Sequence, residues 1–183
     1  MITHPFFEEY KHLIETEQIL VNKERKLLIK ILEENVLSRD DIYFDTDLID
    51  KYIRFSEKWF FPLARYQKFI TPFIFLYFKK NNEPFFNEFL ITLARGGGKN
   101  GFMSTRDAFF ISPLYPVMNY DVTITANSEK QGKVSFEEVY ETIQSKGLEK
   151  TYYLTKMQII GIKHNSVFSF RTNNPKTCLL YTS

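Results

Sequence analysis

Apolar side chains in the first 60 residues recur at the spacing of helices. The clearest repeat consists of Leu27, Leu28, Ile31 and Leu32, and charged side chains occupy the flanking positions. A period of this kind is typical of an amphipathic helix. We therefore predict a helical N-terminal region in which this repeat packs on a core. A further helix is predicted over residues 48–60, after an acidic connection at residues 39–47.

The pattern changes after residue 60. A helical segment is predicted from residue 64 to about residue 80, broken or begun near Pro72, and residues 81–84 form a turn. Beyond it, the predicted strands cover residues 85–93, 120–126, 157–162 and 167–171, and the predicted helices cover residues 100–111 and 128–145. Strands that alternate with helices predict an α/β fold with a largely parallel sheet and flanking helices.

A glycine-rich segment lies between the first of these strands and the first of these helices. Residues 94–101 read Ala-Arg-Gly-Gly-Gly-Lys-Asn-Gly. Glycines allow backbone N–H groups to approach phosphates closely, and the following helix adds its free N–H groups and positive dipole end. Lys99 would supply a charge for the β- and γ-phosphates. The order predicts a nucleotide-binding loop; the alternative is a turn that only closes a strand.

The segment departs from the standard P-loop pattern, G-x-x-x-x-G-K-[ST], at two positions. Leu93 occupies the place of the first glycine, and Asn100 replaces the serine or threonine after the lysine. The amide oxygen of Asn100 can still face Mg²⁺, but as a neutral group in place of a hydroxyl.

Composition and charge set only loose bounds on function. The 183 residues are enough for one domain, and the apolar (44%) and charged (25%) shares are ordinary for a soluble globular protein. A net charge of +2 neither requires nor excludes a nucleic-acid partner. The single cysteine, Cys178, allows no internal disulfide, and the histidines form no metal-ligand pattern.

No apolar run in the sequence is long enough to span a membrane. The longest, residues 69–78, contains Pro72, and the N-terminus has no signal-peptide pattern. We therefore expect a protein without a membrane partner that works in the cytoplasm.

Three segments, in the same order, resemble elements of the large subunit of tailed-phage terminases, the motors that package DNA into capsids. Residues 65–70, Arg-Tyr-Gln-Lys-Phe-Ile, are similar to the family's upstream glutamine element. Residues 94–101 are similar to its variant phosphate loop, which often begins with arginine and lacks the first glycine. Residues 122–131 are similar to the strand, alanine and helix that follow the loop, and residues 170–177 are a weaker match to a later strand and turn.

The resemblance implies that the loop binds ATP. Lys99 would hold the β- and γ-phosphates. The backbone of Gly96, Gly97 and Gly98 would cradle them, and Asn100 would lie near Mg²⁺.

The resemblance also implies roles for two residues outside the glycine run. Arg95 would stabilise charge on the transferred phosphoryl group, as a catalytic residue beside the lysine. Gln67 would read the adenine edge, since an amide can both accept and donate. Without the resemblance, Gln67 is an ordinary polar helix residue and Arg95 is a surface residue that can pair with Glu88.

For the whole protein, the resemblance implies an ATP-driven motor that moves double-stranded DNA into a procapsid, with Mg²⁺ as the metal. A separate nuclease domain would cut concatemeric DNA. The expected partners are phage DNA, the portal protein and the small terminase subunit. The motor would work as a homo-oligomeric ring in the host cytoplasm.

The chain is expected to hold only the front part of such a protein. The family supplies its metal-binding and water-orienting carboxylates from a strand that ends in Asp-Glu, and no acidic residue after Leu93 ends an apolar strand. The predicted parts are a helical region (residues 1–60), a partial P-loop ATPase domain with an incomplete sheet (residues 61–177) and a non-native tail (residues 178–183). The tail reads as a translated sequencing adapter. Such a fragment is expected to bind nucleotide weakly and not to turn it over.

Two other functions fit the same residues. A helicase-type P-loop ATPase shares an upstream glutamine and a similar loop. A non-catalytic nucleotide-binding module is consistent with Leu93 and Asn100 in the loop.

Overall fold

The computed structural model describes residues 2–172, except for the side chains of residues 129, 130 and 172. The end of the segment at residues 170–177 and the predicted non-native tail lie outside the described residues. The chain forms two compact units. The first combines residues up to 50 with residues 63–92, and the second combines residues 51–62 with the chain from residue 93 onward. Within residues 2–172, no helix has the length and apolar character needed to cross a bilayer.

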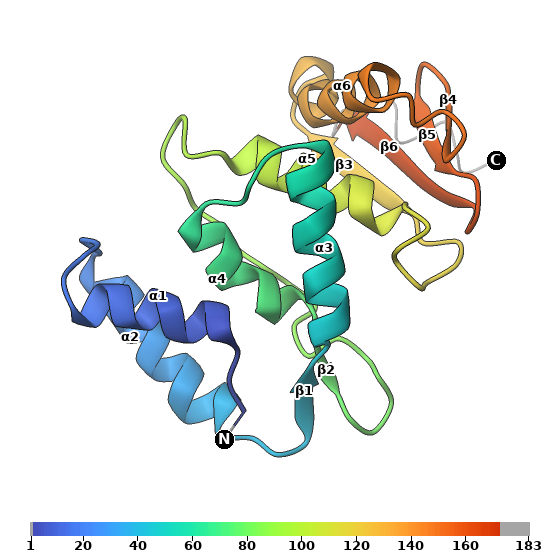
Figure 1. Cartoon of the computed structure of the whole chain (residues 1–183). Helices are drawn as coiled ribbons and strands as arrows, with labels where there is room; N and C mark the ends of the chain where they lie inside the picture. Colours follow the sequence, from blue (N-terminus) through green and yellow to red (C-terminus); the bar gives the residue numbers. More distant parts are fainter. Residues whose placement is uncertain (1, 173–183) are drawn as a thin grey trace. The chain divides into compact units, whose positions relative to one another are not determined.

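The first unit is mainly helical. Its elements are α1 (Pro5–Glu15), α2 (Lys23–Leu32), the π-helical turn η1 (Glu33–Leu37), β1 (Ile42–Phe44), the start of α3 (Thr46–Trp59), α4 (Arg65–Ile74) and β2 (Leu76–Phe78) (Figure 1). Aromatic rings form its core between α1 and α4. The Tyr10 and Phe69 rings stack with centroids 4.6 Å apart, and Phe7 lies edge-on to Phe73. These rings account for part of the aromatic share of the sequence, which is high at 17%.

The helical N-terminal region is confirmed, but the predicted core face of α2 is wrong in three of its four residues. Leu32 is buried together with Ile29, whereas Leu27, Leu28 and Ile31 are 56%, 44% and 42% exposed. Successive residues of a helix are 100° apart, so Ile29 and Leu32 lie on one side while Leu27 and Ile31 lie on the other. Because apolar residues occupy both sides of α2, spacing alone could not select the face that packs.

Two short strands were missed in the first unit. The predicted connection at residues 39–47 contains β1, and the predicted helix to residue 80 ends at Ile74 and is followed by β2. The two strands pair antiparallel, with Tyr43 opposite Tyr77. Their pairing joins segments more than thirty residues apart in the sequence, so a local pattern carries no signal for it.

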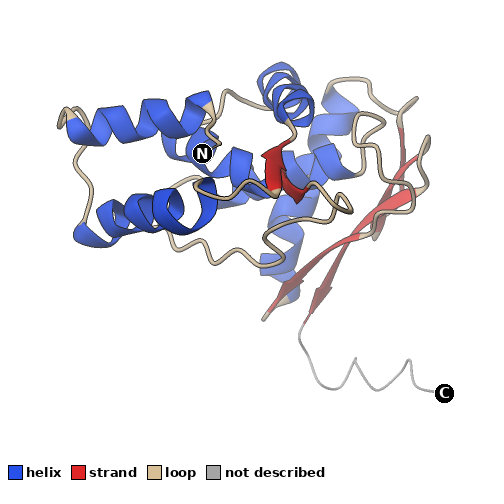
Figure 2. Cartoon of the chain, turned by 90° about the horizontal axis from the view of Figure 1, so that it is seen from below, coloured by secondary structure: helices blue, strands red, loops and turns tan. Residues whose placement is uncertain are grey.

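The second unit contains a four-stranded sheet in the order β3-β6-β5-β4, whose strands are labelled in Figure 1. Figure 2 shows the strands in red. Its elements are the rest of α3, α5 (Lys99–Phe110), β3 (Val122–Ala126), α6 (Glu129–Ser145), β4 (Tyr152–Leu154), β5 (Gln158–Gly161) and β6 (Ser166–Thr172). The helix α6 packs on β3 and β6. Its Phe136 ring contacts the rings of Phe168 and Phe170 on β6. The predicted strands and helices after residue 98 are therefore confirmed to within a few residues.

The prediction of a largely parallel sheet is wrong for the described strands. Only β3 and β6 pair parallel, whereas β6 with β5 and β5 with β4 pair antiparallel. Between β5 and β6 the chain turns tightly, and Asn165 has a φ of 52°. A tight turn joins antiparallel neighbours, while a parallel pair needs a crossover such as α6. The fold class is thus α/β with a mixed sheet.

The predicted strand at residues 85–93 is also wrong. No residue from 85 to 93 belongs to a strand, and Leu90 is 98% exposed. A strand requires a ladder of hydrogen bonds to a neighbouring strand, and among the described residues this run makes one such bond, from the Phe85 N–H to the carbonyl oxygen of Leu76 on β2. Its apolar composition alone could not supply that partner.

Candidate nucleotide-binding loop

The glycine run forms a tight turn that leads directly into α5. The N–H of Gly97 donates to the carbonyl oxygen of Ala94 at 3.0 Å. Gly96, the third residue of that turn, has a φ of 79°, and Gly98, the N-cap of α5, has a φ of 74°. Both lie in the left-handed region that glycine adopts without a steric penalty. The backbone therefore requires glycine at these two positions whether or not a ligand binds.

An open hollow of about 450 Å³ is formed by the loop and the first turn of α5, and its lining consists of residues 93–101. Of the predicted site residues, this hollow brings together Arg95, Gly96, Gly97, Gly98, Lys99 and Asn100.

The charged groups of the hollow are available to an anion. Arg95 and Lys99 are exposed. Among the described residues of the second unit, neither side chain takes part in an ion pair. Two unpaired cations beside a helix start fit a phosphate group.

Besides these side chains, the first turn of α5 presents backbone N–H donors to the hollow. Its N-cap, Gly98, provides no side-chain hydrogen bond, and no acidic residue lies in the turn. The first helical hydrogen bond runs from the N–H of Phe102 to the carbonyl oxygen of Gly98. The N–H groups of residues 99–101, in the first turn, have no acceptor within the helix. This arrangement suits an anion at the helix start.

Gln67 lies apart from the loop in the sequence and belongs to the first unit. It is buried at the start of α4, where its Oε1 accepts from the backbone N–H of Ala64 at 2.8 Å. The reach of this side chain back to the N-cap is half of a capping box. Its role toward adenine stays a prediction.

A buried polar layer behind the loop was not predicted from the sequence. On α5, Ser104 donates to the carboxylate of Glu138 on α6 at 2.7 Å, and Thr105 shares a hydrogen bond of 2.8 Å with Tyr52 on α3. The guanidinium of Arg106 donates to Oδ1 of Asp107 at 2.8 Å. Helical spacing could have placed Ser104 one turn below Asn100, but nothing in the sequence pairs it with Glu138.

Asp107 carries a buried oxygen atom, Oδ2, that has no hydrogen-bond partner. Burial raises the pKa of the Asp107 carboxyl above its usual range, and the neighbouring Arg106 opposes that shift. The folded protein therefore holds this proton more tightly than the unfolded chain does. The protonated Asp107 carboxyl therefore stabilises the folded state fully at pH values below the usual pKa of an aspartate. This stabilisation is lost as the pH rises through the higher pKa of the folded state.

Replacing Asp107 by asparagine should reveal this loss. The free energy of unfolding of Asp107→Asn, minus that of the wild type, is expected to increase as the pH rises from about 3 to about 7. Urea unfolding across that range measures the difference. The exposed Glu137→Gln is the control and should show no such trend. A difference for Asp107→Asn that is independent of pH would contradict the assignment.

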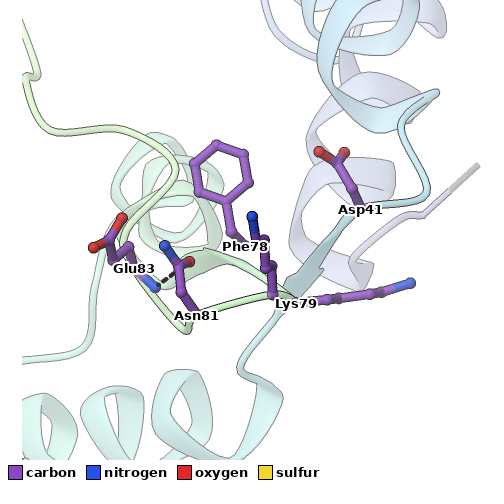
Figure 3. A pocket seen from close by; sticks show the side chains of 6 residues that line it. Asp41, Phe78, Lys79, Asn81 and Glu83 are labelled. Carbon is purple, nitrogen blue, oxygen red and sulfur yellow. Dashed lines mark hydrogen bonds between the residues drawn. The ribbon is translucent and has the colours of Figure 1, made fainter.

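A second hollow, of about 600 Å³, lies in the first unit and is lined by Asp41, Phe78, Lys79, Lys80, Asn81 and Glu83 (Figure 3). Its polar groups already serve the local turns. Lys79 Nζ donates to the carbonyl oxygen of Asp40, and the N–H of Glu83 donates to the Asn81 side chain. Asp41 accepts two hydrogen bonds from Arg39, which lowers the pKa of the Asp41 carboxyl. We assign no ligand to this hollow.

Comparison with solved structures shows the class of fold. The crystal structure of the HK97 bacteriophage large terminase is similar to this chain, with a TM-score of 0.58 over 68% of the chain and 17% sequence identity. The match covers 27% of that terminase chain, so the present chain corresponds to a minor part of its length. No protein-family model matches the sequence, and no curated protein matches it. The chain thus has a terminase-like α/β fold.

Proposed function

We propose that this chain is the ATP-binding part of a DNA-packaging terminase large subunit. The observation that carries the proposal is the loop at the start of α5, with two exposed, unpaired cations, inside a fold similar to that of a phage large terminase. In this proposal Lys99 and the backbone of Gly96, Gly97 and Gly98 hold the triphosphate, and Arg95 neutralises its charge.

The loop provides groups that a bound ATP with Mg²⁺ would need from the protein. When bound, Mg²⁺ neutralises phosphate charge and orients the phosphate oxygens. Within residues 2–172, no group of three or more His, Cys, Asp or Glu side chains gathers to hold a metal ion by itself. In our proposal the ion is held mainly by the nucleotide phosphates, and the amide oxygen of Asn100 is the protein group beside it.

The activity of the whole protein is part of the same proposal. It would use ATP to drive double-stranded phage DNA into procapsids, as a homo-oligomeric ring with the portal protein and the small terminase subunit, in the host cytoplasm. A separate nuclease would cut the concatemer. Gln67 would contribute to adenine recognition in that assembly.

Titration calorimetry with a series of ligands tests the loop. In the presence of Mg²⁺, ATP is expected to bind more tightly than ADP by about tenfold, and AMP is expected to bind more weakly still, because the loop holds the β- and γ-phosphates. Inorganic triphosphate should compete with ATP. Equal binding of ATP, ADP and AMP would refute a triphosphate loop.

A phosphate-release assay, run beside the titration, separates the other two functions from a terminase motor. A non-catalytic module would show the same binding order but no release of phosphate from a longer form of the protein. A helicase-type ATPase would release phosphate in response to single-stranded nucleic acid. A terminase motor is expected to respond to double-stranded DNA.

A further inference from the structure

The first turn of α5 has few local features that stabilise the start of a helix. Its N-cap is Gly98, which provides no side-chain hydrogen bond, and no acidic residue complements the helix dipole. Asn100 and Gly101, inside the turn, both have low helix propensity. The geometry of this turn, which lines the proposed nucleotide site, must therefore depend on neighbouring elements.

Two side chains from other elements meet this turn. The ring of Phe61 lies so close to Gly101 that a Cβ there would be 2.9 Å from two ring carbons. On α6, the half-buried Glu138 accepts the hydrogen bond from the fully buried Ser104 through Oε2, at 2.7 Å. Its other oxygen, Oε1, lies 3.7 Å from the place of that Cβ. The Glu138 carboxylate thus reaches both the first turn of α5 and the residue one turn further along.

We infer that Glu138 is a positioning residue for the nucleotide-binding loop. Its carboxylate ties the start of α5 to α6, so that the first turn is formed before a triphosphate binds. The inference rests on the proposed function of the loop, and it concerns the affinity of that site.

The physical link between this contact and affinity is the population of the formed turn. If the turn is frayed in part of the free molecules, the apparent dissociation constant increases in inverse proportion to the fraction that is formed. A bound phosphate supplies the negative charge that the helix start lacks, so the ligand itself restores the turn. Loss of the Glu138 contact should therefore be visible in the free protein and disappear in the bound protein.

The sign of the effect distinguishes positioning from simple charge. A carboxylate near an anion site repels the triphosphate, so if only its charge mattered, removing it would strengthen binding. If it positions the turn, removing it weakens binding. Replacement by glutamine separates the two contributions, because the amide oxygen can still accept from Ser104 while the charge is gone.

Ser104 retains an acceptor when the carboxylate is removed. Its hydroxyl oxygen lies 2.9 Å from the carbonyl oxygen of Asn100, one turn earlier in α5. The hydroxyl is thus not left without a partner in Glu138→Ala, and the variant is expected to fold. Ser104→Ala removes the donor instead and provides an independent variant of the same contact.

The experiment measures binding of ATP with Mg²⁺ to the full chain by titration calorimetry. Glu138→Ala and Ser104→Ala are each expected to increase the dissociation constant about fivefold, and the double variant no more than either alone. Glu138→Gln should bind at least as tightly as the wild type. Glu137→Ala, an exposed neighbour on the same helix, is the matched control and should bind like the wild type.

Hydrogen exchange provides a second readout, because a positioning role of Glu138 predicts a difference between variant and wild type in the free protein only. Amides of residues 102–104, the first with helical acceptors, should exchange faster in free Glu138→Ala than in the free wild type, and equally slowly once ATP saturates both. Unchanged or tighter binding by Glu138→Ala and Ser104→Ala would overturn the inference, provided that Lys99→Ala still weakens binding about tenfold or more. If the wild type does not bind ATP, or Lys99→Ala binds like the wild type, the proposed function itself fails and the inference falls with it.

Discussion

Replacement of Lys99 by alanine is expected to weaken ATP binding roughly 10- to 100-fold, the range that corresponds to the loss of a charged hydrogen-bonding partner. The side chain is exposed in the hollow and has no ion-pair partner among the described residues, so its charge is free to meet the phosphates. Its removal breaks no described contact of the folded protein, and the free energy of unfolding should change little.

Two control variants separate the effect of the positive charge itself from the effect of its place in the loop. Lys99→Arg keeps the charge but presents a planar group, and it should bind ATP with an affinity between those of the wild type and Lys99→Ala. Lys156→Ala removes one positive charge from the exposed turn between β4 and β5, and it should leave affinity unchanged. If Lys156→Ala weakens binding as much as Lys99→Ala does, the loop holds no specific site and the effect is one of net charge.

Replacement of Gly161 by alanine is expected to lower the free energy of unfolding by about 3 kcal/mol. A Cβ at this position in β5 would lie 1.9 Å from the carbonyl oxygen of Ile111, the C-cap residue of α5. The obstacle is a backbone atom, so no side-chain rotation relieves it. The sheet or the end of α5 must move, and both contribute to the core of the second unit. Urea denaturation measures the loss.

Gly132 provides the matched control, since it lies in the same unit and receives the same substitution. A Cβ there would meet its nearest neighbours, on β6 and β3, at 3.6 and 3.7 Å, which is ordinary contact. Because Gly132 lies inside α6, alanine should raise helix propensity, and Gly132→Ala is expected to gain up to about 1 kcal/mol. Equal losses at the two glycines would show that the close approach at Gly161 does not govern stability.

Part of the fold was predictable because its signals are local. The helix α3 has clear apolar periodicity, and the strands β3, β5 and β6 are short runs rich in Val, Ile, Phe and Thr that are bounded by turn residues. Ser128, whose side chain accepts from the N–H of Gln131, is a typical N-cap and explains why the start of α6 was placed closely. The direction in which strands pair has no such local signature, which is why the mixed sheet was missed.

The candidate site was predictable for a similar reason. Gly96 and Gly98 occupy positions with positive φ, and Lys99 follows directly, so the whole loop is contiguous in the sequence. The supporting residue Glu138 could not be found in this way. It is one of several acidic residues on α6, and only the packing of α6 against α5 distinguishes it from the exposed Glu137.

Local signals account for the order of most elements, the turn-forming glycines and the charged groups of the loop, because propensity and turn chemistry act between residues close along the chain. Packing between distant segments sets which face of α2 is buried, which strands pair and in which direction, and that residues 85–93 form no strand. It also placed Glu138 on Ser104. Each of these outcomes depends on contacts between distant segments, where packing and hydrogen-bond partners override local preference.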